Sequence, residues 1–146
     1  MKLLVVEDNV QSANLLVRLF ESTGYEVVHK THGLEGLKAT REEDFDAVLL
    51  DFNLPDIDGS QIGLLLRSRF KYIPLIALTS QDDKVTRHKA RIFGFDAFIA
   101  KPWNIKDLLN TVQALTNQKR NVERDKTITV VEHKLNTEEM IAATKR

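Results

Sequence analysis

The chain has 146 residues, of which 42% are hydrophobic and 29% charged, a composition typical of a soluble domain large enough for a single core. Basic and acidic residues number 21 each. Residues 1–117 hold 14 basic against 16 acidic residues, and residues 118–146 hold 7 against 5. Neither part concentrates positive charge, so direct nucleic-acid binding is not evident. The lack of cysteine excludes disulfides and thiolate metal sites and fits a reducing compartment.

Apolar runs typical of buried strands alternate with segments of helical periodicity along the first 117 residues. We expect strands near residues 2–6, 25–29, 46–50, 73–78 and 96–100. We expect helices at about residues 10–22, 33–41, 59–70, 83–92 and 104–117. Five β-α units with short links predict an α/β fold, in which a doubly wound parallel sheet is covered by helices on both faces. Residues 1–117 would form this domain.

Residues 118–146 lack this alternation and are expected to be a C-terminal extension. Its first part, to residue 126, is polar and charged, as in a linker or a fraying helix. The β-branched run Thr127–Val131 predicts a short strand, and residues 138–143 predict a brief helix. Three roles stay open for the extension: a linker, a disordered tail, or a segment that docks near the fourth helix, fifth strand and fifth helix of this domain or of a second copy.

Ionisable or hydroxyl side chains stand at the ends of four of the expected strands. Glu7 and Asp8 come after the first strand, and Asp51 closes the third. Thr79 ends the fourth strand and Lys101 follows the fifth. The carboxyl ends of parallel strands meet at one edge of the sheet, where open α/β sheets bind ligands. Three carboxylates, a hydroxyl and an ammonium gathered there predict a site for a divalent metal ion and a phosphoryl group.

Five motifs in order make the chain resemble the receiver domain of two-component response regulators. They are Val6-Glu7-Asp8-Asn9, Leu50-Asp51, Leu54-Pro55-Asp56-Ile57-Asp58-Gly59, Leu78-Thr79, and Gly94-Phe95-Asp96-Ala97-Phe98-Ile99-Ala100-Lys101-Pro102. Each motif alone is a weak signal, whereas their order and spacing together are specific. The resemblance covers roughly residues 1–117 and implies the flavodoxin-like strand order 2-1-3-4-5.

The resemblance also implies a metal site around the phosphoacceptor. Asp51 would accept the phosphoryl group and form an aspartyl phosphate. Asp8 and Asp51 would contact Mg²⁺ or Mn²⁺ directly, Glu7 would act through a bound water, and Asn53 would offer its backbone carbonyl. Oxygen ligands of this kind suit Mg²⁺, which keeps several waters.

Two further roles follow from the same resemblance. Lys101 would neutralise one phosphoryl oxygen and Thr79 would donate a hydrogen bond to another. Thr79 and Phe98 would form the switch: the Thr79 hydroxyl moves toward the phosphoryl group and leaves room for the Phe98 ring to turn inward.

The implied function is a phosphoacceptor switch of a two-component or phosphorelay system. Its phosphoryl donor would be a histidine kinase or a histidine phosphotransfer protein. It would signal by protein–protein contact to an unknown downstream protein, and a homodimer is one form in which it could do so. It would not be an enzyme beyond catalysing its own phosphoryl uptake and loss. The N-terminus shows no signal-peptide pattern and no apolar run is long enough to cross a bilayer, so we expect a cytoplasmic protein without membrane contact.

Three other interpretations are open to test, and a fourth is excluded. The chain could be the receiver part of a longer DNA-binding regulator. It could be a flavin-binding flavodoxin-like module, although the loop after the first strand opens with two acids that would repel an anion. The string Asp56-Ile57-Asp58-Gly59 resembles the nucleophile loop of haloacid-dehalogenase-like phosphatases, but Leu54-Pro55 separates it from the strand. An EF-hand starting at Asp51 is excluded because Asp56 stands where that loop requires glycine.

Overall fold

The computed structural model describes residues 1–69 and 72–144, with side chains described up to residue 124. The strands are β1 (Lys2–Val6), β2 (Glu26–Lys30), β3 (Ala47–Asp51), β4 (Leu75–Thr79) and β5 (Ala97–Ala100). The helices are α1 (Val10–Ser22), α2 (Gly33–Glu42), α3 (Gly59–Arg69), α4 (Lys84–Ile92) and α5 (Ile105–Thr144). The predicted alternation of strands and helices is confirmed, with boundaries that differ by at most two residues except at the end of α5.

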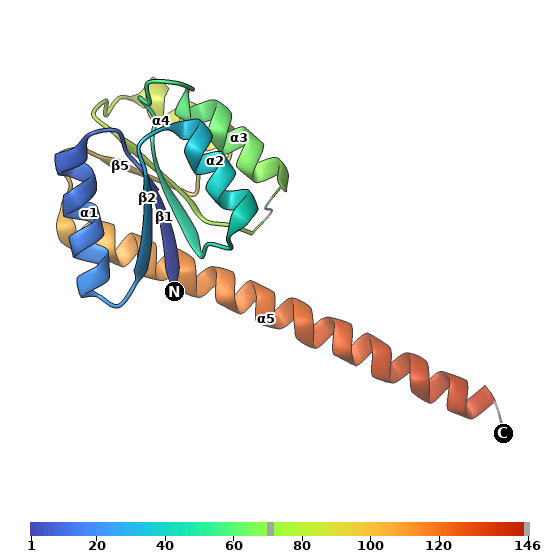
Figure 1. Ribbon diagram of the computed structural model, residues 1–146. Coiled ribbons are helices and arrows are strands. Elements are labelled where there is room, and N and C mark those ends of the chain that lie inside the picture. The colour runs from blue at the N-terminus through green and yellow to red at the C-terminus, as the bar shows by residue number, and fades with distance from the viewer. Residues whose placement is uncertain (70–71, 145–146) are drawn as a thin grey trace.

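The five strands form one parallel sheet in the order β2-β1-β3-β4-β5. Helices α1 and α5 cover one face, and α2, α3 and α4 cover the other (Figure 1). The doubly wound fold and the strand order implied by the resemblance are therefore confirmed. In this order β1 lies between β2 and β3, so the chain reverses its direction of winding next to β1, where such sheets bind ligands.

Alternate side chains of each strand enter two separate cores, because successive residues of a strand point to opposite faces. In β1, Leu3 and Val5 pack with α1 and α5, whereas Leu4 and Val6 pack with α2 and α3. All four are at most 1% exposed. Burial on both faces explains why β1, β3 and β4 consist mainly of continuous apolar runs.

Local signals set where several helices begin and end. Asn9 caps α1 by accepting a hydrogen bond from the Ser12 amide at 2.9 Å, and Asp83 caps α4 through the Thr86 amide at 2.7 Å. Asn104 accepts a hydrogen bond from the Asp107 amide at 3.1 Å at the start of α5. Gly24 and Gly94, with φ of 93° and 88°, follow α1 and α4 in the left-handed conformation that glycine adopts without strain.

Helix α5 is 40 residues long and runs out beyond the domain (Figure 1). The predicted strand Thr127–Val131 is wrong, since this run lies inside α5. The segment up to residue 126, predicted as a linker or a fraying helix, and the helix predicted at 138–143 are both helical, but they are parts of one continuous α5. The helix is nucleated where residues such as Leu108 and Val112 pack on the sheet, and each further residue then adds a hydrogen bond at little cost. No glycine or proline interrupts residues 105–144, so the modest helix penalty of β-branched residues does not end the helix.

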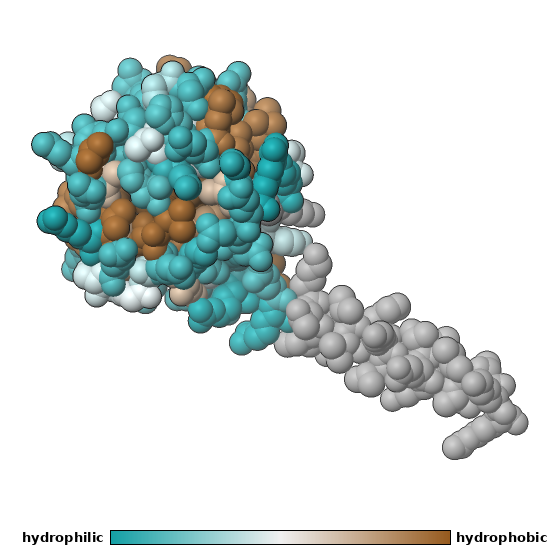
Figure 2. All heavy atoms as spheres, in the orientation of Figure 1, coloured by the Kyte–Doolittle hydropathy of each residue, from teal (hydrophilic) through white to brown (hydrophobic). Residues whose placement is uncertain are grey.

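The surface has no single apolar face in the view of Figure 2, where apolar patches are separated by hydrophilic side chains. Exposed large apolar residues occur on several elements, among them Val10 on α1, Leu34 on α2, Leu64 on α3 and Val85 on α4. Scattered exposure of this kind is ordinary for a globular protein. Among the described residues, no helix combines the length and the hydropathy that crossing a membrane would require.

Candidate functional site at the carboxyl ends of the strands

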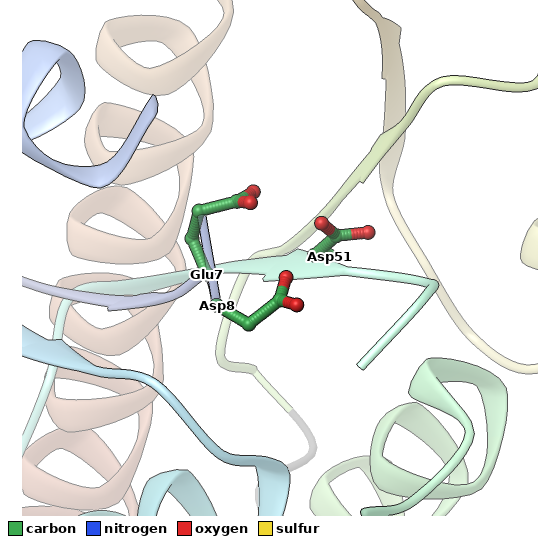
Figure 3. Close-up of side chains that lie close together, drawn as sticks. All are labelled: Glu7, Asp8 and Asp51. Atoms are coloured by element: carbon green, nitrogen blue, oxygen red, sulfur yellow. The ribbon is translucent and has the colours of Figure 1, made fainter. Parts of the chain in front are cut away.

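Three carboxylates meet where β1 and β3 end. Glu7 and Asp8 follow β1, Asp51 is the last residue of β3, and carboxylate oxygens of all three lie within 4.8 Å of one another. Figure 3 shows their side chains gathered around a common space. Glu7 is fully buried and Asp51 is 4% exposed, while Asp8 is exposed to solvent. The structure therefore brings together the three acids that the sequence predicted to meet.

The backbone around this cluster is held by hydrogen bonds that continue the sheet past the strand ends. The Glu7 amide donates to the Lys30 carbonyl at 3.1 Å, and the Phe52 amide donates to the Leu78 carbonyl at 3.0 Å. The Asn9 amide donates to Glu7 Oε1 at 3.2 Å. These bonds fix the acids on a rigid scaffold, as a preorganised site requires.

Lys101 is the cation in contact with the cluster. Its Nζ lies 3.1 and 3.0 Å from the two oxygens of Glu7 and 3.3 Å from Asp51 Oδ2. Its amide donates to the Thr79 carbonyl at 2.7 Å, which ties the residue to the end of β4. The predicted placement of Lys101 beside Asp51 is confirmed by this geometry.

The electrostatics of the cluster are unbalanced. Burial and the nearby charge of Asp51 raise the pKa of Glu7 to about 7, although the Lys101 ammonium opposes this rise. For Lys101, burial lowers the pKa, but the hydrogen bond with Glu7 and the charge of Asp51 outweigh burial and raise it. Three carboxylates facing one ammonium leave negative charge that a divalent cation with oxygen ligands would neutralise. The residues present therefore fit a divalent metal ion.

Asn53 lies in the loop between β3 and α3, two residues after Asp51. Its amide donates to Asp51 Oδ1 at 2.8 Å, so the chain turns directly over the carboxylate. The contribution of its carbonyl to a metal ion stays a prediction.

Thr79 and Phe98 lie on neighbouring strands. Thr79 is fully buried, and its Oγ1 accepts a hydrogen bond from the Gln81 amide at 3.0 Å. Thr79 pairs with Ala100 in the sheet, so Phe98, two residues earlier, projects from the same face. The half-buried Phe98 ring has the Arg87 guanidinium carbon 4.8 Å from its centroid. The two residues are neighbours, as a switch would require, and the switching itself stays a prediction.

Three contacts near the site were not found from the sequence. The His29 ring Nε2 donates to the Glu7 carbonyl at 2.8 Å, and the Trp103 ring has Lys101 Nζ 5.4 Å from its centroid. Asp56 accepts hydrogen bonds from the start of α2. Trp103 stands two residues after Lys101, a spacing that could have pointed to it. His29 and Asp56 carry no such signal, because their partners are remote in sequence.

A parallel sheet in this order, with acids, a threonine and a lysine at its strand ends, defines a receiver-type α/β domain. The family model described as response regulator receiver domain matches residues 3–113. The chain belongs to this family, and it is thus a receiver domain of two-component signalling.

Two curated relatives support this family assignment. The chain is 32% identical over 113 residues to the polar-differentiation response regulator DivK of Brucella anthropi, covering 76% of this chain and 92% of DivK. It is 34% identical over 115 residues to the probable transcriptional regulatory protein SilR of Salmonella typhimurium, covering 79% of this chain but 50% of SilR. This chain thus matches only about half of SilR.

Two solved structures show the same fold. The CheY-like receiver of Methanospirillum hungatei superposes with a TM-score of 0.78 at 26% identity, covering 82% of this chain and 96% of that one. The receiver domain of the sensor histidine kinase PA1611 from Pseudomonas aeruginosa has a TM-score of 0.74 at 26% identity, covering 80% and 97%. That structure is described with a magnesium ion coordinated in its active-site cleft.

Proposed function

We propose that this receiver is a phosphoacceptor switch, phosphorylated on Asp51 by a histidine kinase or a histidine phosphotransfer protein. The observation that carries the proposal is the position of Asp51. This carboxylate closes β3, lies 3.3 Å from the Lys101 ammonium, and shares its surroundings with Glu7 and Asp8. A carboxylate beside a cation and a cluster that could hold a metal ion is suited to accepting a phosphoryl group.

The metal ion we propose is Mg²⁺ or Mn²⁺. Asp8 and Asp51 would hold it directly, Glu7 through a water, and Asn53 through its carbonyl. When bound, the ion supplies positive charge next to the phosphoryl oxygens. The all-oxygen donor set of the cluster and the magnesium described in the PA1611 receiver support this choice.

The transfer itself needs little more than positioning. An Asp51 oxygen attacks the phosphorus atom in line with the donor histidine, the new P–O bond forms, and the P–N bond to the histidine breaks. Lys101 moves its ammonium from Glu7 toward one phosphoryl oxygen, and the Thr79 hydroxyl donates to another. The product is an aspartyl phosphate, which water later hydrolyses.

The domain would catalyse its own phosphoryl uptake and loss and act on no other substrate, so it would be a switch rather than an enzyme. Its downstream partner would be a protein that distinguishes the two states. We place this signalling in the cytoplasm. The phosphatase-like alternative is disfavoured because both carboxylate oxygens of Asp56 accept amide hydrogen bonds from α2 and are not presented as a nucleophile.

Acetyl phosphate with Mg²⁺ tests the proposal directly. We expect intact-mass spectrometry to show one phosphoryl group per wild-type chain, and none for Asp51→Asn or for wild type with a chelator. Asp44→Asn, a matched change at an exposed acid remote from the cluster, should be labelled like wild type. Full labelling of Asp51→Asn, or mapping of the phosphoryl group to Asp56, would overturn the assignment.

The switch is tested separately from phosphoryl uptake. Thr79→Ala should accept the phosphoryl group, yet the NMR signals of the Phe98 ring should no longer change on phosphorylation as they do in wild type. Thr79→Ser keeps the hydroxyl and should restore the change. An unaltered Phe98 response in Thr79→Ala would disprove the coupling.

A further inference from the structure

Helix α2 begins without a cap of its own. His32, at the N-cap position, makes no side-chain hydrogen bond to the helix. The carboxylate of Asp56 does so instead: its Oδ1 accepts from the Gly33 amide at 2.9 Å and its Oδ2 from the Leu34 amide at 3.0 Å. The amides at the start of a helix need acceptors, and a charged acceptor there also benefits from the helix dipole. The start of α2 is therefore completed by the loop that follows Asp51.

Apolar contacts reinforce this join. Gly33 has no side chain, and a Cβ placed there would overlap Ile57 of the same loop and Ile62 of α3. Ile57 packs against the core shared by α2 and α3. A side chain at residue 33 would therefore require Ile57 or Ile62 to shift, so the glycine permits this close approach between α2, the loop and α3.

The loop Phe52–Asp58 is held at both ends as well as at Asp56. At its base, the Gly59 amide donates to the Phe52 carbonyl at 3.2 Å, and the Asn53 amide donates to Asp51 Oδ1 at 2.8 Å. At its far end, Asp58 Oδ1 accepts from the Ser60 amide at 3.0 Å. The bonds of Asp56 fix the middle of the loop, between the carbonyl of Asn53 and the start of α3.

Asp56 is suited to this role because it is charged at neutral pH. Burial raises its pKa, but the amides of Leu34 and Gly33 outweigh burial and hold the pKa below its usual value. The two hydrogen bonds are therefore made to a carboxylate, and such charge-assisted bonds are stronger than neutral ones.

We propose that Asp56 is a positioning residue, which holds the loop Phe52–Asp58 against α2. Through this loop, which contains Asn53, metal binding at Asp51 would be coupled to the order of the first turn of α2. The inference rests on the proposed metal site. Coupling between two sites is reciprocal, so a loop that is fixed by α2 binds the ion more tightly, and a bound ion stabilises the start of α2. The first turn of α2, with its exposed Leu34, thereby senses the state of Asp51.

Magnesium affinity of the full chain is the first measurement, by calorimetric titration with Mg²⁺ alone. We expect Asp56→Ala to weaken the affinity about tenfold, as the loss of residues that support metal ligands commonly does. Asp56→Asn keeps one carbonyl acceptor and should recover part of the affinity. Asp83→Ala is the matched control: it removes the carboxylate cap of α4 and should lower the melting temperature without changing the magnesium affinity.

Amide hydrogen exchange is the second measurement. Mg²⁺ should slow exchange at Gly33 and Leu34 in wild type and should have no effect on these amides in Asp56→Ala. This measurement on wild type stands even if Asp56→Ala does not fold.

The outcomes separate this inference from the proposed function. Unchanged magnesium affinity in Asp56→Ala, or a loss no larger than in Asp83→Ala, overturns the positioning role while the metal site stands. Exchange at Gly33 and Leu34 that does not respond to Mg²⁺ in wild type overturns the coupling. A wild-type chain that binds no Mg²⁺ overturns the metal site and this inference together.

Discussion

The carboxyl ends of the strands hold buried acids that share a cation. Glu7 and Asp51 are almost fully buried, both contact the Lys101 ammonium, and both lie near Asp8. Burial raises the energy of the charged carboxylates, and their mutual repulsion adds to it, as the raised pKa of Glu7 shows.

The opposite end of the sheet, where the strands begin, has acids and lysines too. Lys2 pairs with Glu43 and lies 3.8 Å from Glu26, while Lys119 of α5 donates to the Phe45 carbonyl at 2.9 Å and lies 4.0 Å from Asp46. The acids there are 39% to 72% exposed. Water screens such exposed pairs, so they contribute little to the free energy of unfolding, and their charges need no further counter-ion.

The difference teaches that residue type alone does not make a site. Carboxylate and ammonium groups form partly exposed ion pairs where the strands begin, whereas where the strands end Glu7 and Asp51 are buried and three carboxylates face one ammonium group. Buried groups of the second kind, among them Glu7 with its raised pKa, are candidates for a functional site. Single substitutions at each end of the sheet test this difference.

The largest expected effect is that of removing the cation at the site. Lys101→Met leaves Glu7 and Asp51 without their ammonium partner, and breaking a buried pair of this kind costs about 3–4 kcal/mol of unfolding free energy. Urea unfolding at pH 8 without metal measures it. Adding Mg²⁺ should recover part of the loss, because the ion supplies the missing positive charge. A loss of unfolding free energy no larger than that of Lys119→Met would contradict the expected difference between the two ends of the sheet.

A smaller effect is expected from the titration of Glu7. Because its pKa in the metal-free folded chain is about 7, above the ordinary value of 4.5, its contribution to stability is complete below pH 4.5 and is lost as the pH rises through 7. Metal-free wild type should therefore lose about 2–3 kcal/mol relative to Glu7→Gln between pH 4.5 and 8. Denaturant unfolding across this range gives the slope, and saturating Mg²⁺ should flatten it. Parallel curves for the two proteins would refute the buried-acid description.

The smallest effect is expected at the opposite end. Lys119→Met removes the hydrogen bond to the Phe45 carbonyl and partly exposed ion pairs, which together contribute about 1 kcal/mol. Urea unfolding should show this small loss, with magnesium affinity and phosphorylation equal to wild type. A changed magnesium affinity would mean that the two ends of the sheet communicate through α5.

The acidic site was predictable because its residues follow strands, and in a parallel sheet the ends of β1, β3, β4 and β5 meet at one edge whatever the details of packing. The helix over Thr127–Val131 was not predictable from its own β-branched residues. Its conformation depends on the preceding turns of α5 that pack on the sheet, which a local pattern does not contain.

The sequence by itself determined the alternation of elements and the approach of Glu7, Asp8, Asp51 and Lys101, because apolar runs and strand-end positions are local properties of the chain. Only the tertiary structure decided the raised pKa of Glu7 and the capping of α2 by Asp56. Both depend on burial and on partners that are distant in sequence and become neighbours only when the sheet and its helices pack.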